Sequence, residues 1–121
     1  MTIEEYVKIA VDAAEEKKSE DTVILNIGKV SVIADYFVIT TANNISQLQA
    51  VVDNVDEKLT KAGLQAKCIE GKGDSNWILM DYGDFIVHVF DREGRSFYDL
   101  ERIWKDADEL NVNDFYKSDR V

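Results

Sequence analysis

The chain has 121 residues, a length that fits one domain able to bury a core without disulfides or metals. Its 24 acidic and 14 basic residues give a formal net charge of -10 at pH 7, so its mean field repels phosphate backbones and favours a basic partner. Direct nucleic-acid specificity is therefore not expected, because neutralising a phosphate backbone needs clustered Lys and Arg.

The cysteine content and the N-terminal residues indicate the cellular compartment of the protein. The one cysteine, Cys68, cannot form an internal disulfide and lacks the companions of a zinc site. The opening residues, MTIEEYVKIAVDAAEEKK, are acidic and amphipathic, unlike a secretory signal or a transit peptide. No apolar run has the length of a membrane span. These features predict a cytoplasmic, bacterial protein that does not associate with membranes.

The first 70 residues alternate helical and strand patterns. Thr2 and Glu5 form a capping box, and the apolar residues that follow recur at helical spacing. Asn43 and Asn44 offer caps for a second helix, which Gly63 ends. The predicted elements are helices over about 3–17 and 44–62, strands over 22–27, 35–41 and 65–70, and a hairpin within 77–90. Residues 35–41 (DYFVITT) are apolar on both faces, which predicts a central strand.

The remaining residues complete the predicted architecture. After the hairpin, DREGR is read as a turn and SFYDLERIW as a short helical or irregular packing segment. We divide the chain into a domain over 1–104 and an acidic C-terminal tail over 105–121. The element order predicts an α/β (α+β) single domain with a mixed five-stranded sheet flanked by helices.

The stretch GDSNWILMDYGDFIVHVFD, residues 73–91, is predicted to form a hairpin. If Gly83 and Asp84 make the two-residue turn, Tyr82 faces Phe85; if the turn is one residue earlier, Asp81 faces Asp84 at some electrostatic cost. Both registers sort the side chains identically, because face membership alternates along a strand.

The two faces of this hairpin differ in chemistry. One face, wholly apolar but for a phenol, is predicted to pack on the core: Ile78, Met80, Tyr82, Phe85, Val87 and Val89. The second face carries Trp77, Leu79, Asp81, Ile86, His88 and Phe90. Two interpretations stay open for the second face. In the first, a helix covers this face and His88 is a core histidine. In the second, part of this face is an exposed patch that binds a protein.

Residues for catalysis or metal binding are not gathered in any recognised pattern. The strict Asp-x-Asp motif, Asp106-Ala-Asp108, lies in the acidic tail, and Gly71-Lys-Gly73 lacks the Lys-Ser/Thr of a phosphate loop. Cys68 and His88 are the one possible thiol–imidazole pair. We therefore predict no enzyme activity, metal or cofactor, and keep a residual nucleotidyltransferase-type nucleotide-binding enzyme as the alternative.

Several motifs resemble the Iojap family, also called the ribosomal silencing factors. They are D-Y-F at 35–37, N-W at 76–77, D-Y-G-D at 81–84, H-V-F at 88–90 and F-Y-D-L-E at 97–101. The resemblance runs from about residue 7 to residue 104. It implies a small fold similar to nucleotidyltransferases but without their catalytic carboxylates.

The resemblance also implies a function and a binding surface. Such proteins bind the large ribosomal subunit through its protein L-fourteen, block association with the small subunit and lower translation under nutrient limitation. Members are described as dimers when free, so a homodimer using the same sheet face is a further expectation. Carried over by motif, the expected contacts with the ribosomal protein are Trp77, Asp81, Tyr82, His88, Phe90, Tyr98 and Leu100. Trp77, His88 and Phe90 are expected to supply contact area, and Asp81 to meet a basic residue.

Overall fold

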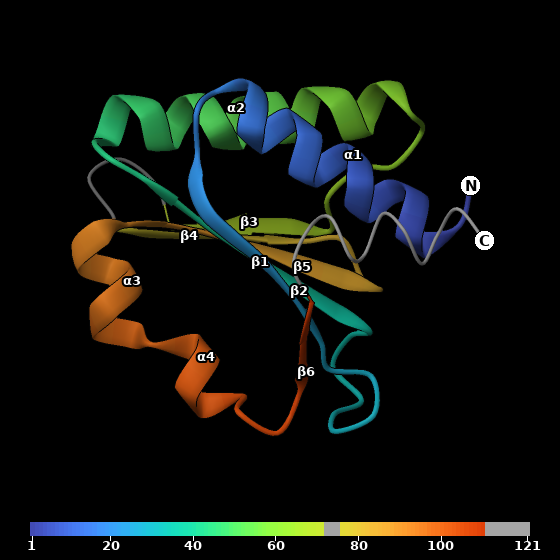
Figure 1. Ribbon diagram of the computed structural model, residues 1–121. Helices are drawn as coiled ribbons and strands as arrows, with labels where there is room; N and C mark the ends of the chain where they lie inside the picture. Colours follow the sequence, from blue (N-terminus) through green and yellow to red (C-terminus); the bar gives the residue numbers. More distant parts are fainter. Residues whose placement is uncertain (72–75, 111–121) are drawn as a thin grey trace.

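A computed structural model describes residues 1–71 and 76–110 of the chain. Its helices are α1 (Ile3–Glu16), α2 (Ile45–Lys61), α3 (Arg92–Tyr98) and α4 (Leu100–Ile103), and its strands are β1 (Glu20–Asn26), β2 (Tyr36–Ala42), β3 (Cys68–Glu70), β4 (Trp77–Asp81), β5 (Phe85–Asp91) and β6 (Asp108–Leu110). Figure 1 shows α1 and α2 together over one face of the sheet, with α3 and α4 on the opposite side. The described residues thus form the predicted single α+β domain.

The strands form one mixed sheet in the order β3-β4-β5-β2-β1-β6. The pairing of β2 with β5 is parallel, from Tyr36↔Phe85 to Ala42↔Asp91, and the other pairs are antiparallel. A parallel pair needs a crossover connection, which α2, β3 and β4 provide here. The prediction that residues 35–41 form a central strand is confirmed, since β2 is hydrogen-bonded on both sides and buried on both faces.

Side-chain caps fix where the two long helices begin. The backbone N–H of Glu5 donates to Oγ1 of Thr2 over 3.1 Å, and that of Gln47 donates to Oδ1 of Asn44 over 2.8 Å. Each cap satisfies a backbone donor that has no partner within its helix. Both predicted helix starts are therefore confirmed, and α2 ends before Gly63, whose φ of +96° suits glycine.

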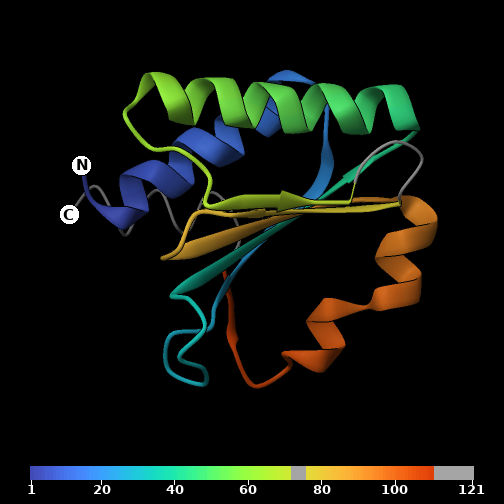
Figure 2. The same cartoon turned by 180° about the vertical axis from the view of Figure 1, so that it is seen from behind.

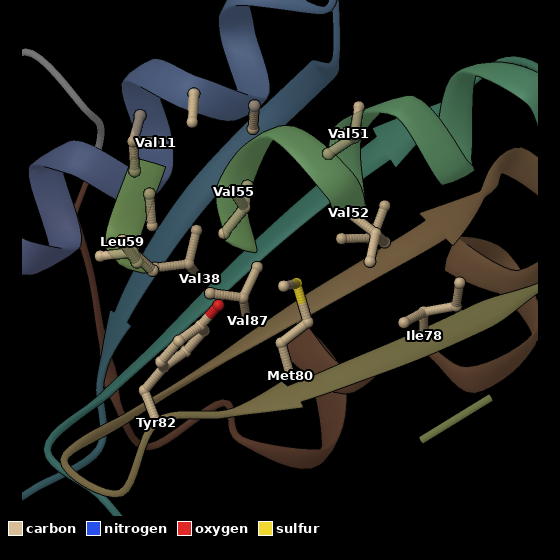
Figure 3. Packing of buried hydrophobic residues seen from close by; sticks show 14 of the residues in the cluster. Val11, Val38, Val51, Val52, Val55, Leu59, Ile78, Met80, Tyr82 and Val87 are labelled. Carbon is tan, nitrogen blue, oxygen red and sulfur yellow. The ribbon is translucent and has the colours of Figure 1, made fainter. Parts of the chain in front are cut away.

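Apolar side chains from α1, α2 and one sheet face form the larger core. Val11, Val51 and Val55 face Val38 and Val87 across this layer, and all five are buried (Figure 3). The buried amide of Asn54 on α2 donates from Nδ2 to the backbone oxygen of Ala13 over 2.7 Å and so ties the two helices together. Burial of this apolar surface is the main stabilising contribution to such a layer.

Two parts of the prediction were wrong at the C-terminal side. The sheet has six strands, not five, because Asp108–Leu110, within the predicted tail, pairs antiparallel with β1 as far as Ile24↔Leu110. A three-residue acidic strand carries too little alternation to be read from sequence; it forms on the backbone edge of β1. The segment read as the turn DREGR begins α3 instead, since the Asp91 carboxylate caps the N–H of Gly94 over 2.7 Å. Residues 72–75 and 111–121 lie outside the described residues.

Candidate functional site

The hairpin has the register in which Tyr82 faces Phe85. The ladder between β4 and β5 runs from Trp77↔Phe90 to Asp81↔Ile86, and the Tyr82 N–H donates to the Phe85 oxygen over 3.0 Å. Gly83 and Asp84 are thus the two turn residues, and Gly83 has a φ of +88° that a side chain would strain. The predicted sorting of side chains onto two faces is confirmed.

Tyr82 lies on the core face, as strand parity predicted. Its ring is 4% exposed and stacks on Phe85 with a centroid distance of 5.2 Å. Its hydroxyl donates to Oδ1 of Asp56 on α2 over 3.4 Å, and burial followed by the charge of Asp56 raises the pKa of the phenol. Tyr82 therefore joins the hairpin to α2 and contributes nothing to the second face.

Over β5, the second sheet face is covered rather than open. Phe90 is 0% exposed, His88 3% and Leu100 7%. Phe90 and Leu100 pack in one buried cluster with Phe37, and the ring of His88 meets that of Phe37 edge to face at 4.6 Å. The expectation that His88 and Phe90 supply contact area is corrected, because the helical segment after β5 lies over them.

His88 is a neutral histidine held by a tryptophan. The indole Nε1–H of Trp77 donates to Nδ1 of His88 over 3.1 Å, which requires that Nδ1 carry no proton. Burial lowers the pKa of His88 from 6.5 to about 3. The second nitrogen, Nε2, is buried and has no hydrogen-bond partner among the described residues. His88 is thus an uncharged acceptor that fixes the orientation of the indole.

An aromatic cluster lies around this pair. Trp77 stacks on Phe90 at a centroid distance of 5.3 Å and meets Tyr98 in a tilted contact at 4.5 Å. Tyr98 in turn meets the ring of Phe97 edge to face at 5.1 Å. Phe97 is 77% exposed, so a continuous set of rings connects the buried sheet face with the protein surface.

Gly94 and Arg95 determine how closely α3 approaches the sheet. A Cβ at Gly94 would lie 2.3 Å from the backbone oxygen of Asn76, so glycine is required there for the close packing. The guanidinium of Arg95 donates from Nε and Nη2 to the two carboxylate oxygens of Glu101 on α4, at 2.9 and 3.1 Å, and from Nη1 to Oγ1 of Thr41 at 2.7 Å. Arg95 thereby fastens both short helices to β2.

The second face remains open at its other end, over β4 and β3. Cys68 and Glu70 of β3 stand directly opposite Asp81 and Leu79 of β4, so the four side chains share this face with Trp77. Cys68 and Glu70 are exposed, and the three β4 residues are partly exposed. A hollow of about 190 Å³ is lined by Glu70, Gly71, Trp77 and Leu79. We define the open half of the second face as these strand side chains, with Tyr98 beside Trp77 and Phe97 beside Tyr98: Cys68, Glu70, Trp77, Leu79, Asp81, Phe97 and Tyr98.

Asp81 has a structural role at the edge of this surface. Its Oδ1 accepts the N–H of Gly83 over 2.8 Å, which stabilises the hairpin turn. The carboxylate is still partly exposed, so it can also meet a cation from outside. Of the seven residues expected to contact a partner, Trp77, Asp81 and Tyr98 reach the open half, whereas Tyr82, His88, Phe90 and Leu100 are buried.

Sequence reasoning did not single out Phe97 and Ile103 as exposed. They are 77% and 67% exposed and lie on α3 and α4. The two helices meet at Asp99, whose φ of 47° breaks a helical pattern that would otherwise run on. Without knowing that break, the outward-facing residues cannot be derived from helical spacing.

Metal and thiol chemistry receive no support from the described part of the chain. Within residues 1–71 and 76–110, no three His, Cys, Asp or Glu side chains lie close enough to hold a metal ion. Cys68 and His88 stand on strands separated by β4, and Nδ1 of His88 is already bonded to Trp77. The possible thiol–imidazole pair is therefore not formed. None of the described helices has the length and apolar character needed to cross a bilayer.

The comparisons with known proteins agree with the motifs and the fold. The family model described as "Ribosomal silencing factor during starvation" (RsfS) matches residues 1–121. The chain is 38% identical over 107 residues to the ribosomal silencing factor RsfS of Bacillus subtilis, covering 88% of this chain and 91% of that one. A crystal structure of a Chromobacterium violaceum protein superposes with a TM-score of 0.84 at 32% identity, covering 87% of this chain and 88% of that chain.

A less similar relative comes from a mammal. The mouse protein named "Mitochondrial assembly of ribosomal large subunit protein 1" is 27% identical over 105 residues, which cover 81% of this chain and 44% of that protein. The fold and the sequence similarity thus place this chain in a class of small α+β proteins whose printed names refer to ribosomes. This chain belongs to the RsfS family of ribosomal silencing factors.

Proposed function

We propose that the chain is a cytoplasmic translational repressor that binds the large ribosomal subunit through ribosomal protein L-fourteen. Bound there, it blocks association with the small subunit by steric exclusion and lowers translation under nutrient limitation. Membership of the ribosomal silencing factor family over the whole chain carries this proposal. The role needs no catalysis, because occupying the joining face of the large subunit is sufficient.

The open half of the second face is the surface we assign to the ribosomal protein. Trp77 and Phe97 offer aromatic area of the kind that dominates interface energy. Glu70 and Asp81 lie beside it and suit a basic partner, in keeping with the net charge of -10. A specific interface buries about 1,200–2,000 Å² in total, about half of it on each partner, which a domain with 6694 Å² of accessible surface can supply.

The buried members of the motif set have a supporting role in this proposal. His88 fixes the indole of Trp77 by the 3.1 Å hydrogen bond, and Phe90 lies under the same ring at 5.3 Å. A rigid aromatic side chain loses less conformational entropy on binding than a mobile one. His88 and Phe90 therefore raise the affinity for the ribosomal protein by fixing the orientation of Trp77, without contacting the partner themselves.

Sedimentation with isolated subunits tests the proposed function. The protein is expected to move with large subunits and not with small ones in a sucrose gradient, and to bind purified ribosomal protein L-fourteen in a pull-down. Binding to small subunits alone, or equal binding to large subunits depleted of that protein, would contradict it.

A further inference from the structure

A second surface lies on the other side of the same sheet edge, between α2 and β3. Two adjoining hollows of about 270 and 250 Å³ share Asp56 and Ile69. On the helix side they are lined by residues 49, 52, 53, 56 and 60, whose spacing places them on one face of α2. Figure 2 shows α2 running along and above β3. We call this the α2–β3 groove; it lies mainly on the core side of the sheet and meets the open half of the second face at the edge strand, where Cys68 and Gly71 also line its hollows.

The backbone of β3 borders this groove as an edge strand. In the sheet order β3 is outermost, and among the described residues β4 is its one partner. An edge strand presents unpaired N–H and C=O groups along its outer side, and these groups recognise the backbone of any extended segment laid beside them. A strand edge beside a helix is thus a site for an added strand.

The side chains that line the groove determine which kind of peptide it can bind. Its floor is apolar: Val52 is 4% exposed and Ile78 is 1% exposed, with Ile69 beside them. Its helical wall carries the carboxylates of Asp53 and Asp56. A polypeptide that places an apolar side chain on the floor and Lys or Arg against the wall fits both features.

The two wall carboxylates are already held in position. Oδ1 of Asp53 accepts from Nε2 of Gln49 over 2.9 Å, and Oδ1 of Asp56 accepts from the Tyr82 hydroxyl over 3.4 Å. In the part of the chain that the structure describes, neither carboxylate forms an ion pair, whereas Glu57 on the same helix pairs with Lys61 at 3.5 Å. Asp53 and Asp56 are thus oriented acids available to an external cation.

We propose that the α2–β3 groove binds an extended basic peptide segment that adds as a strand to β3. Its groove-facing side chains, two residues apart, alternate basic and apolar. From residue 49 to residue 60 the helix spans about 16 Å, which matches about five residues of extended chain. Acidic walls repel both a nucleic acid and a second copy of this acidic chain, so a basic segment of another protein is the occupant.

Peptide binding measured by fluorescence anisotropy tests this proposal. The probe is a labelled seven-residue peptide in which Lys, Val and Arg alternate with Thr, and the matched peptide carries Glu in place of Lys and Arg. Saturable binding of the basic probe and none of the acidic one is expected. Asp53→Asn and Asp56→Asn should each weaken binding by about three- to fivefold at low salt.

Glu57→Gln provides the matched control, because it removes one charge from α2 outside these two hollows and should change affinity less than about twofold. The bound peptide should shift the backbone amide resonances of Cys68, Ile69 and Glu70 in an NMR titration. Equal weakening by Glu57→Gln would show non-specific charge attraction and overturn the proposal. Resonance shifts centred on Trp77 and Phe97 would also overturn it. A dimer of the protein that pairs through β3 and excludes the probe would overturn it as well. Ribosome binding does not enter these readouts, so failure here leaves the proposed function standing.

Discussion

The indole N–H of Trp77 donates to Nδ1 of His88 over 3.1 Å, so side chains as well as backbone join β4 to β5. This hydrogen bond requires that Nδ1 of His88 carry no proton, and it therefore forms when the imidazole ring is uncharged. It connects a buried strand residue with a partly exposed one, and thereby the core with the surface assigned to the ribosomal protein.

Trp77→Phe should lower the free energy of unfolding by about 1–2 kcal/mol. The ring stacking on Phe90 is largely kept, but Nδ1 of His88 loses its donor while still buried. Urea denaturation measures the change. Trp104→Phe is the control, because Trp104 contacts Phe37 edge to face at 5.2 Å and forms no hydrogen bond through its indole among the described residues. Equal losses in the two variants would mean that the Trp77–His88 bond contributes nothing.

Stability should fall as the pH falls from 7 to 5. Burial lowers the pKa of His88 from 6.5 to about 3, so below pH 6.5 the unfolded chain takes up a proton that the folded chain does not accept until about pH 3. Stability therefore rises with pH in this window, and the linkage amounts to about 2 kcal/mol between pH 5 and 7. His88 is the chain's one histidine, which isolates its titration there.

His88→Gln is the matched variant for this pH dependence, since it keeps an acceptor for Trp77 but cannot titrate. Its unfolding free energy, measured by urea titration at several pH values, should change much less between pH 5 and 7. A wild-type protein whose stability is flat over this range would show that His88 is protonated in the folded state or exposed.

Gly94→Ala should destabilise the protein by about 2 kcal/mol or more, because the new methyl group would lie 2.3 Å from the Asn76 oxygen and push α3 from the sheet. Thermal unfolding measures the effect. At Gly63 a Cβ meets nothing within 4 Å, and the cost there comes from the φ of +96° alone. Gly63→Ala should therefore cost about 1 kcal/mol. A larger loss of stability for Gly63→Ala than for Gly94→Ala would contradict the close packing of α3.

Arg95→Ala should cost about 1.5–3 kcal/mol, since it removes a two-pronged contact with Glu101 and a bond to Thr41 at a side chain that is 15% exposed. Arg92, which pairs with Glu20 at the surface, is the comparison. Its side chain is 58% exposed, so Arg92→Ala should change the unfolding free energy by less than about 1 kcal/mol. Similar losses at the two positions would show that Arg95 does not anchor the C-terminal helices.

Much of the fold follows from local sequence chemistry. The caps at Thr2 and Asn44, the turn at Gly83 and the apolar character of β2 each depend on neighbouring residues, and each was predicted. Strand β6 was not, because a three-residue acidic segment is stabilised by the edge of β1 rather than by its own pattern.

The candidate site was predicted in part. Strand parity sorted Tyr82 and Trp77 onto opposite faces correctly, but parity does not tell which part of a face is covered. That depends on where α3 packs, which rests on the Asp91 cap and on Gly94 meeting Asn76 across the fold. From the residues alone it stayed open whether His88 lies in the core or in an exposed patch, and the resemblance to the family implied that His88 and Phe90 supply contact area. Both are buried, as in the interpretation in which a helix covers this face.

The most direct test of the central claim is a subunit-joining assay, with light scattering as the readout and variants of the open half of the second face. Wild-type protein should prevent joining of large and small subunits. Trp77→Ala combined with Phe97→Ala should abolish that inhibition, while Ile45→Ala, which removes a 46% exposed apolar side chain from α2, should inhibit as wild type does. Full inhibition by a folded Trp77→Ala, Phe97→Ala protein would contradict the assignment of this surface.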